Sequence, residues 1–292
     1  MKQILVTGAT GNIGSEVIKY LTESDSDGEI IAAVRSVEKA KSKFVENPGL
    51  SFRPFDFENP ESFKSAFVGI DILFLLRPPH ISDVETVFRP LLNSAKENGI
   101  KNIVFLSVQG AEKSKVIPHN KIERIIQESK FNYIFVRPSY FMQNLTTTLL
   151  PEIVNERSIT LPAGKAKFNW IDVENIGEAT ANLILGFESN GNKAFEITGS
   201  ENKSFSEVTQ MMTEITGHQI RYKSINPVSF YFKKKKEGMD SGFALVMSLL
   251  HFLPRFQAAP DISDNYQLLT GKTPTTLQEF IRREEKMLMK PF

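Results

Sequence analysis

The first fifteen residues constrain the fold of this chain more than any other segment. Ile4–Val6 is a short β-branched and aliphatic run, which predicts a strand buried on both faces of a parallel sheet. Gly8, Gly11 and Gly14 follow at a spacing of three residues, and apolar residues then recur at helical intervals from Val17. The segment therefore predicts a strand, a glycine turn and a helix, in that order.

That order brings backbone N–H groups and the positive end of a helix dipole to one point, which favours a bound phosphate. Gly8 allows a tight turn, Gly11 a close approach of the pyrophosphate, and Gly14 close packing of helix on strand. The spacing is G-x-x-G-x-x-G rather than the standard G-x-G-x-x-G, and a purely structural turn is the alternative. The expected dinucleotide contacts are Gly8, Thr10, Gly11, Asn12, Ile13 and Gly14.

A second predicted strand, Glu29–Val34, ends at Arg35. In a dinucleotide fold the residue at this strand end lies beside the adenosine ribose. An acid there binds the 2′-hydroxyl of NAD, whereas an arginine accommodates the 2′-phosphate of NADP. No acid stands at this strand end, and the planar guanidinium suits phosphate. Arg35 therefore predicts NADP(H) as the cofactor; the alternative is a solvated arginine at a helix start.

Short apolar strands and helices then alternate as far as Val136. Strands are expected at Ser51–Pro54, Asp71–Leu76, Asn102–Leu106 and Asn132–Val136, and helices at Val37–Val45, Pro60–Phe67, Asp83–Asn98 and Lys121–Ser129. This alternation is typical of an α/β protein with a Rossmann-type, doubly wound parallel sheet. Ligands lie beyond the carboxyl ends of such strands. The further candidate cofactor contacts at these ends are Asp56, Phe57, Leu76, Arg77 and Ser107.

The pattern changes after Tyr140. Shorter helices and strands around a proline–glycine turn predict a smaller C-terminal α+β substrate lobe. Long helices are expected at Asn144–Glu156 and Leu277–Met289, and Ser204 with Glu207 has the pattern of a capping box. We assign residues 1–140 to the NAD(P)-binding domain, with 172–198 returning to it, and residues 141–171 and 199–292 to the substrate or cap lobe.

The composition excludes several other classes of protein. The chain has 292 residues, a formal net charge of +1 and no cysteine. Near-neutral charge gives no reason to expect a nucleic acid or an anionic membrane as partner. The lack of cysteine excludes disulfides and thiolate metal sites, and four scattered histidines offer no metal-ligand spacing. With no signal-peptide pattern and no apolar run long enough to span a bilayer, we expect a cytoplasmic protein.

Several motifs resemble the NmrA-like family of atypical short-chain dehydrogenases/reductases over essentially the whole chain. They are the opening Val6–Gly14 segment, Arg35, the Asp56 turn, Arg137–Asn144, Trp170–Val173 and the closing Leu269–Phe280. The branch they most resemble contains triphenylmethane reductase and type-2 quinone oxidoreductase. The resemblance implies a Rossmann domain with a small C-terminal lobe, and usually NADP. It leaves activity open, because some members reduce quinones or dyes and others act as redox sensors.

The predicted catalytic residues differ from the usual pattern of that superfamily. Its members normally carry Tyr-x-x-x-Lys before the sixth strand and a serine after the fifth. Ser107 fills the serine position, but His119 and Glu123 stand where tyrosine and lysine are expected. His119 is expected to titrate near neutrality, which makes it a candidate proton donor or a ligand for an acceptor oxygen; capping or stacking is the alternative. Tyr140 is a candidate wall for a flat substrate, or a core residue.

Two functions fit these residues. The first is an NADP(H)-dependent oxidoreductase that transfers hydride to a quinone-like or other conjugated aromatic acceptor, with the protein orienting the reactants. The alternative is a non-catalytic NADP-binding redox sensor of the NmrA type that acts on a protein partner. An epimerase or dehydratase of nucleotide sugars is disfavoured, because that chemistry normally needs the tyrosine–lysine pair.

Overall fold

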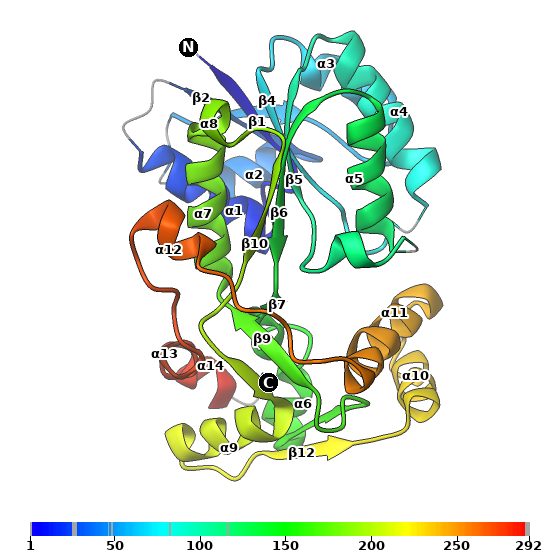
Figure 1. Ribbon diagram of the computed structural model, residues 1–292, viewed down its shortest axis with the longest axis vertical. Coiled ribbons are helices and arrows are strands. Elements are labelled where there is room, and N and C mark those ends of the chain that lie inside the picture. The colour runs from blue at the N-terminus through cyan, green and yellow to red at the C-terminus, as the bar shows by residue number, and fades with distance from the viewer. Residues whose placement is uncertain are drawn as a thin grey trace. The chain divides into compact units, whose positions relative to one another are not determined.

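The structure is a computed structural model that describes residues 2–24, 28–45, 47, 49–81, 83–115 and 117–289 (Figure 1). The chain divides into two compact units. Unit 1 comprises Met1–Pro138, Val173–Ile197 and Asn265–Lys272, and unit 2 comprises Ser139–Asp172, Thr198–Asp264 and Thr273–Phe292.

Unit 1 is built on a seven-stranded parallel sheet with the order β10-β6-β5-β4-β1-β2-β3. The strands are β1 Gln3–Val6, β2 Glu29–Val34, β3 Ser51–Pro54, β4 Ile72–Leu76, β5 Asn102–Leu106, β6 Asn132–Pro138 and β10 Lys193–Ile197. The order runs outward in both directions from β1, which lies between β2 and β4. The predicted α/β, doubly wound sheet is therefore confirmed, and its switch point lies where the glycine turn leaves β1.

Helices cover both faces of this sheet (Figure 1). They are α1 Asn12–Thr22, α2 Val37–Lys43, α3 Glu61–Phe67, α4 Val84–Glu97, α5 Pro118–Glu128, α7 Val173–Leu185, α8 Phe187–Asn190 and α12 Asn265–Thr270, with a 3-10 turn η1 at Ala111–Lys113. Phe63, Phe88 and Ile122 from α3, α4 and α5 join one buried apolar cluster with the sheet. The tightest helix contact joins α1 and α7, where a Cβ on Gly177 would overlap that of Glu16.

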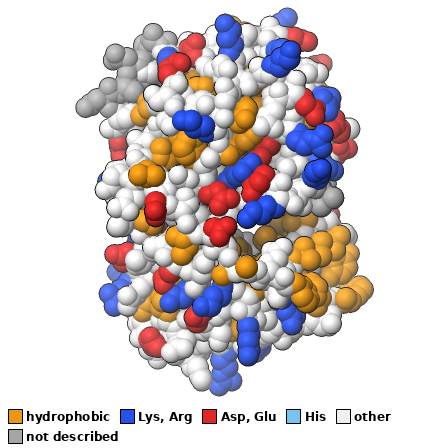
Figure 2. All heavy atoms as spheres, in the orientation of Figure 1, with side chains coloured by type: hydrophobic (Ala, Val, Ile, Leu, Met, Phe, Trp, Pro, Cys, Tyr) orange, Lys and Arg blue, Asp and Glu red, His pale blue; other side chains and the backbone are white. Residues whose placement is uncertain are grey.

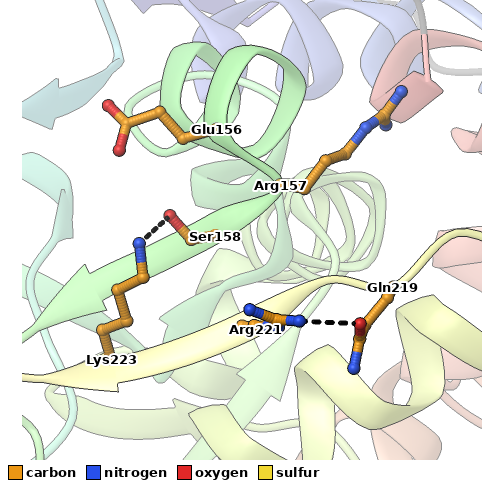
Figure 3. Close-up of a pocket in the computed structure, with 6 residues that line it drawn as sticks. All are labelled: Glu156, Arg157, Ser158, Gln219, Arg221 and Lys223. Carbon is orange, nitrogen blue, oxygen red and sulfur yellow. Dashed lines mark hydrogen bonds between the residues drawn. The ribbon is translucent and has the colours of Figure 1, made fainter.

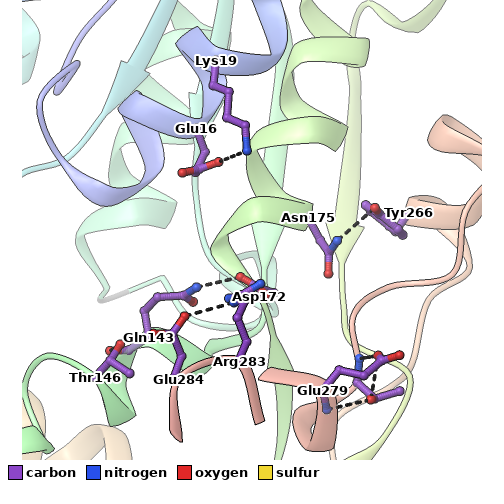
Figure 4. A network of polar contacts seen from close by, with 11 residues as sticks. Glu16, Lys19, Gln143, Thr146, Asp172, Asn175, Tyr266, Glu279, Arg283 and Glu284 are labelled. Atoms are coloured by element: carbon purple, nitrogen blue, oxygen red, sulfur yellow. Dashed lines mark hydrogen bonds and ion pairs between the residues drawn. The ribbon is translucent and has the colours of Figure 1, made fainter. Parts of the chain in front are cut away.

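Two features of unit 1 differ from the sequence expectation. Helix α5 begins at Pro118 rather than Lys121, since proline is favoured in a first helical turn. Residues 265–272, assigned from the sequence to the C-terminal lobe, belong to unit 1. Tyr266 explains their return: its hydroxyl donates to Glu178 Oε2 at 2.6 Å and accepts from Asn175 Nδ2 at 2.9 Å, as Figure 4 shows for Asn175.

Unit 2 contains two small sheets. Strands β7 Tyr140–Phe141, β9 Lys167–Ile171 and β11 Asn202–Ser204 form one, and β8 Ser158–Leu161 and β12 Arg221–Ser224 form the other. The helices are α6 Leu150–Glu156, α9 Phe205–Thr216, α10 Pro227–Lys236, α11 Ser241–Phe252, α13 Leu277–Arg283 and α14 Glu285–Met289, with 3-10 turns η2 Met142–Leu145 and η3 Leu253–Phe256. Trp170, Phe205 and Phe280 are fully buried at its core. This is the predicted smaller α+β lobe.

Some elements of unit 2 were not foreseen. The helix expected at 144–156 starts only at Leu150, because Pro151 lacks a backbone N–H and fits the first turn. The helix expected at 277–289 is interrupted at Glu284. The predicted capping box of Ser204 and Glu207 is present. Fully buried Asp172 ties separate segments together, since its carboxylate accepts from Gln143 Nε2 at 2.6 Å and pairs with Arg283 Nη2 at 2.9 Å (Figure 4).

Candidate functional site

The glycine loop after β1 is a tight turn with no room for larger side chains. Gly8 has a φ of +61°, which favours glycine, and its carbonyl accepts from the N–H of Gly11 at 2.8 Å. A Cβ at Gly8 would overlap the side chain of Leu76. A Cβ at Gly14 would overlap the backbone of Gly8, so the third glycine lets α1 pack directly on the turn. These contacts match the tasks that the spacing assigned to the first and third glycines.

The start of α1 faces outward and is open. Gly11 is the N-cap, and no side chain in the described part of the chain caps this helix. Thr10, Gly11 and Asn12 are exposed, whereas Ile13 and Gly14 are buried beneath them. The first N–H groups of a helix have no acceptor within the helix. The loop therefore presents free donors and the positive end of the α1 dipole at one exposed point, which fits a phosphate.

Arg35 lies at the end of β2, directly before α2. Its side chain is exposed, and within the described ranges it makes no hydrogen bond or ion pair. Lys43, at the other end of α2, donates to the carbonyl of Thr10 at 2.7 Å. The edge of unit 1 beside the glycine loop thus carries an unpaired guanidinium and an ammonium. Neither cation forms an ion pair with a carboxylate among the described residues, so both charges are available to a phosphate.

Two candidate cofactor contacts, Asp56 and Phe57, follow β3. Asp56 is half-exposed. Asp56 Oδ1 accepts from the N–H of Glu58 at 3.1 Å, and the N–H of Asp56 donates to Ser62 Oγ at 3.0 Å. Phe57 is half-buried against Phe55, with ring centroids 4.9 Å apart. Asp56 therefore organises its own turn, and Phe57 packs on the apolar core while keeping part of its ring accessible.

Leu76 and Arg77 end β4 beside the glycine loop. Leu76 is half-buried, and its N–H donates to Thr7 Oγ1 at 3.2 Å, which ties the ends of β1 and β4 together. The guanidinium of Arg77 donates to the carbonyls of Pro78, Pro79 and Ile81. Burial lowers the pKa of Arg77. Arg77 therefore braces the loop after β4 and adds a fixed positive charge to the sheet edge.

Ser107 and Asn120 contribute buried oxygen atoms with no partner. Ser107, at the end of β5, is 2% exposed, and its Oγ has no hydrogen bond among the described residues. Asn120 in α5 donates from Nδ2 to the carbonyl of Ala111 at 3.1 Å, but its Oδ1 is likewise without a partner there. Buried polar atoms are normally paired, so each such atom suggests a ligand or water. The sequence pattern pointed to Ser107 but missed Asn120, which lies next to His119.

His119 lies in the first turn of α5, with its ring centroid 6.3 Å from that of Phe105. Burial and the positive charge of Arg77 lower the pKa of His119 to about 3. The expectation that it titrates near neutrality is therefore wrong, because desolvation disfavours the charged ring. No hydrogen bond occupies either ring nitrogen within the described residues. His119 thus offers a neutral imidazole that can donate one hydrogen bond and accept another.

Glu123, one turn along the same helix, does not pair with His119. Its two carboxylate oxygens accept from Arg137 Nε at 3.0 Å and Nη2 at 2.7 Å. Glu123 is 3% exposed, so the bidentate pair is buried. Arg137 Nη1 also donates to Glu112 Oε2 at 2.6 Å. The structure places Glu123 in an ion pair that joins α5 to β6, with both oxygens engaged, and this assigns it a structural task.

Tyr140 belongs to unit 2 and lies in an aromatic cluster there. Its ring is 4.8 Å from that of Trp170 and 5.3 Å from that of Phe168. Its hydroxyl lies 3.0 Å from His251 Nε2, while His251 Nδ1 lies 2.8 Å from the carbonyl of Met247. Since the carbonyl can only accept, Nδ1 carries the proton and the hydroxyl of Tyr140 donates to Nε2. Burial raises the pKa of Tyr140, and the structure gives its side chain a packing role.

The sequence and structure of this chain match known proteins over nearly its full length. A model of the NmrA-like family matches residues 1–281. The chain belongs to the NmrA-like family. The family and the fold class predicted from the motifs are confirmed.

Three known proteins are similar to this chain over nearly its full length. The Prestalk A differentiation protein A of Dictyostelium discoideum is 28% identical over 280 residues, which cover 96% of this chain and 91% of that protein. The NAD(P)H azoreductase of Xenophilus azovorans is 28% identical over 284 residues, covering 96% of each. The crystal structure of Citrobacter sp. triphenylmethane reductase complexed with NADP(H) is 26% identical, has a TM-score of 0.81, and is matched over 97% of this chain and 99% of that one. NAD(P)H reductases are thus among the distant relatives of this NmrA-like protein.

Unit 2 of this NmrA-like protein also has a surface pocket of about 250 Å³, shown in Figure 3. It is lined by Glu156, Arg157, Ser158, Gln219, Arg221 and Lys223. Arg221 Nη2 donates to Gln219 Oε1 at 3.0 Å and Lys223 Nζ to Ser158 Oγ at 3.4 Å, so two of its cations already have partners (Figure 3). The glycine loop and its neighbours in unit 1 remain the candidate site.

Proposed function

We propose that this protein is an NADP(H)-dependent reductase that transfers hydride to a conjugated aromatic acceptor such as a quinone. The observation that carries the proposal is the open, exposed start of α1 behind the Gly8–Gly14 turn, with unpaired Arg35 at the end of the neighbouring strand. A pyrophosphate fits the free amides of the turn, and a 2′-phosphate fits the guanidinium. NADPH supplies the hydride when bound.

Two relatives and the residues of helix α5 support a conjugated acceptor. An azoreductase and a triphenylmethane reductase are similar to this chain over nearly its whole length. Both names refer to extended conjugated substrates. A conjugated acceptor needs less acid catalysis than an isolated carbonyl, which agrees with a helix that carries His119 and Glu123 instead of the tyrosine–lysine pair.

The residues of this chain would act mainly by binding and orientation. The turn residues Thr10–Asn12 hold the pyrophosphate and Ser107 Oγ hydrogen-bonds a polar group at the end of β5. Because the pKa of His119 is about 3, its ring is neutral at pH 7 and serves as a hydrogen-bond donor to an acceptor oxygen or nitrogen. The proton that completes the reduction then comes from solvent rather than from an imidazolium.

The test is NADPH consumption with a panel of quinones, azo dyes and triphenylmethane dyes. His119→Ala is expected to lower kcat/KM for the best acceptor about ten-fold or more, as for loss of one hydrogen bond made in the transition state. Lys121→Ala is the matched control, because Lys121 is exposed on the same helix. Equal rates in wild type and His119→Ala would remove His119 from the proposed site.

A redox sensor that binds NADP without turnover is the second candidate. The observation that favours it is the commitment of both Glu123 oxygens to Arg137, which leaves α5 with no charged proton-transfer pair. Tight NADPH binding with no oxidation by any acceptor on the panel would support this candidate. Turnover of one acceptor that falls in His119→Ala would exclude it.

A further inference from the structure

Helix α11 and the turn η3 of unit 2 expose a continuous row of large apolar side chains. Six residues that are between 43% and 74% exposed make up this row, which we call the α11 stripe: Leu245, Val246, Leu249, Leu250, Leu253 and Phe256. They follow one another in steps of one and three residues, as i, i+1, i+4, i+5, i+8 and i+11, so they share one side of the helix and of the turn that continues it. Figure 2 shows hydrophobic side chains gathered where Figure 1 labels α10 and α11.

The opposite side of α11 is already packed. Ala244, Met247, Ser248 and His251 are buried, and His251 joins the aromatic cluster around Tyr140. The helix is therefore apolar on both its inner and its outer side. A surface helix normally turns charged or polar residues outward. A contiguous exposed apolar row on such a helix indicates an interaction surface.

The neighbouring helix α10 supplies positive charge next to the stripe. Helices α10 and α11 pack against each other, and α10 ends in Lys233–Lys236. Lys233 and Lys234 pair with Glu237, whereas Lys235 and Lys236 are exposed. Lys235 donates to Ser241 Oγ and its charge helps to lower the pKa of Asp240, whereas Lys236 has no hydrogen bond or ion pair among the described residues. Between Asp240 and Asp261 the sequence contains no acidic residue. The hairpin thus combines an apolar side with exposed ammonium groups.

We propose that the α10–α11 hairpin docks on the surface of an anionic lipid membrane. The stripe would enter the boundary between head groups and acyl chains, and Lys235 and Lys236 would meet the lipid phosphates. Phe232 and Val228 of the neighbouring helix α10 are also exposed apolar residues. The attachment is peripheral, since no helix in the described residues is long and apolar enough to cross a membrane.

The side-chain types favour lipid over a protein partner. Specific protein interfaces carry about one hydrogen bond per 100–200 Å² and are enriched in aromatic residues, methionine and arginine rather than in leucine and valine. The six residues of the stripe are leucine, valine and phenylalanine, none of which can form a directional hydrogen bond. A hydrocarbon boundary needs no such partners. The net charge of +1 led to the expectation of no membrane partner. A net charge describes the whole chain, however, and does not reveal that apolar and basic residues are concentrated on this hairpin.

Co-sedimentation of the full-length protein with vesicles tests the proposal. Wild-type protein is expected to bind vesicles that contain phosphatidylglycerol, to bind pure phosphatidylcholine vesicles much more weakly, and to be released by high salt. Exchanging Lys235 and Lys236 together for glutamine should weaken binding about five-fold per lysine. Absence of the wild-type protein from the vesicle pellet at low salt would overturn the proposal.

Leu249→Glu combined with Leu250→Glu should abolish vesicle binding while the thermal midpoint stays close to that of wild type, because both side chains are exposed. Leu268→Glu is the matched control: Leu268 is 80% exposed on α12 of unit 1 and should retain full binding. Equal vesicle binding by the double variant and by Leu268→Glu would overturn the assignment of the stripe. A second result would also overturn it: the wild-type protein forms a dimer in sedimentation analysis, the double variant is a monomer, and neither binds vesicles. The stripe would then be covered by a second copy of the chain.

Discussion

Helix α1 of unit 1 and helix α9 of unit 2 begin in opposite ways. Helix α9 starts with a capping box, in which Ser204 Oγ accepts from the N–H of Glu207 and the Glu207 carboxylate accepts from the N–H of Ser204. Helix α1 starts at Gly11 with no side-chain cap in the described residues. The protein satisfies the free N–H groups of one helix internally and leaves those of the other exposed. The missing cap beside a glycine turn supports the proposed phosphate site at the start of α1.

His119 and His251 repeat the contrast. Burial lowers the pKa of both, to about 3 for His119 in unit 1 and about 4 for His251 in unit 2. Both ring nitrogens of His251 are engaged, by Tyr140 and by the carbonyl of Met247. Neither nitrogen of His119 has a partner among the described residues. A lowered pKa therefore belongs to a fully engaged structural group in one unit and to a half-buried group with no described partner in the other.

The largest loss of NADPH binding is expected from a side chain at Gly14, where α1 packs directly on the glycine turn. Gly14→Val places a side chain into the backbone of Gly8, so α1 must move away from the turn and its amides lose their alignment. Two charge-assisted hydrogen bonds lost at about 1.5–3 kcal/mol each would weaken NADPH binding more than a hundred-fold. Fluorescence titration with NADPH measures this, and circular dichroism checks that the sheet persists.

Gly49→Ala is the control for this variant, because no atom lies within 4 Å of its added methyl group. It should bind NADPH like wild type. If Gly14→Val bound equally well, the contrast between α1 and α9 would carry no functional meaning.

The next prediction is a loss of stability when the ion pair that joins α5 to β6 is broken. Glu123→Gln leaves the buried Arg137 guanidinium without its bidentate partner and should lower the free energy of unfolding by about 3–5 kcal/mol. Glu112→Gln removes the other carboxylate of the same arginine, but Glu112 is exposed, so at most about 1 kcal/mol should be lost. Urea unfolding of both variants checks the ranking. Similar losses in the two would mean that burial does not distinguish these pairs.

Arg35 should decide between the two dinucleotides. Arg35→Ala removes an exposed guanidinium expected to meet the 2′-phosphate, so the Kd for NADPH should rise about ten- to one-hundred-fold while the Kd for NADH stays unchanged. Lys41→Ala, an exposed cation on α2, serves as the charge-matched control. Parallel weakening of NADPH and NADH binding in Arg35→Ala would exclude the assigned role.

Local patterns predicted the elements that depend on neighbouring residues. The β1–glycine–α1 segment and the capping box of Ser204 each lie within a short stretch of sequence, so their residue types suffice to identify them. The pairing of β12 with β8 and the return of α12 to unit 1 depend on contacts between distant residues. Strand β12 is mostly exposed and polar, so it has no apolar alternation to reveal it.

The same limit applies to the candidate site. The positions of Gly14, Arg35 and Ser107 follow from the order of strands and turns. The pKa of His119 could not be read from the sequence, since it depends on burial by distant segments and on the charge of Arg77. The pairing of Glu123 with Arg137 likewise joins a helix to a strand and removes the carboxylate that the His-x-x-x-Glu spacing suggested.

The pH dependence of stability tests the contrast between the two histidines. His251 has a pKa of about 4 in the folded protein against an ordinary value of 6.5, so the unfolded chain binds its proton first as pH falls. The free energy of unfolding should therefore drop between pH 6.5 and pH 4, at about 1.4 kcal/mol per pH unit for this group. His251→Gln lowers stability overall but should make this pH slope shallower by that amount. An unchanged slope in His251→Gln would mean that His251 can take up a proton inside the aromatic cluster, and the distinction drawn between the two histidines would then fail.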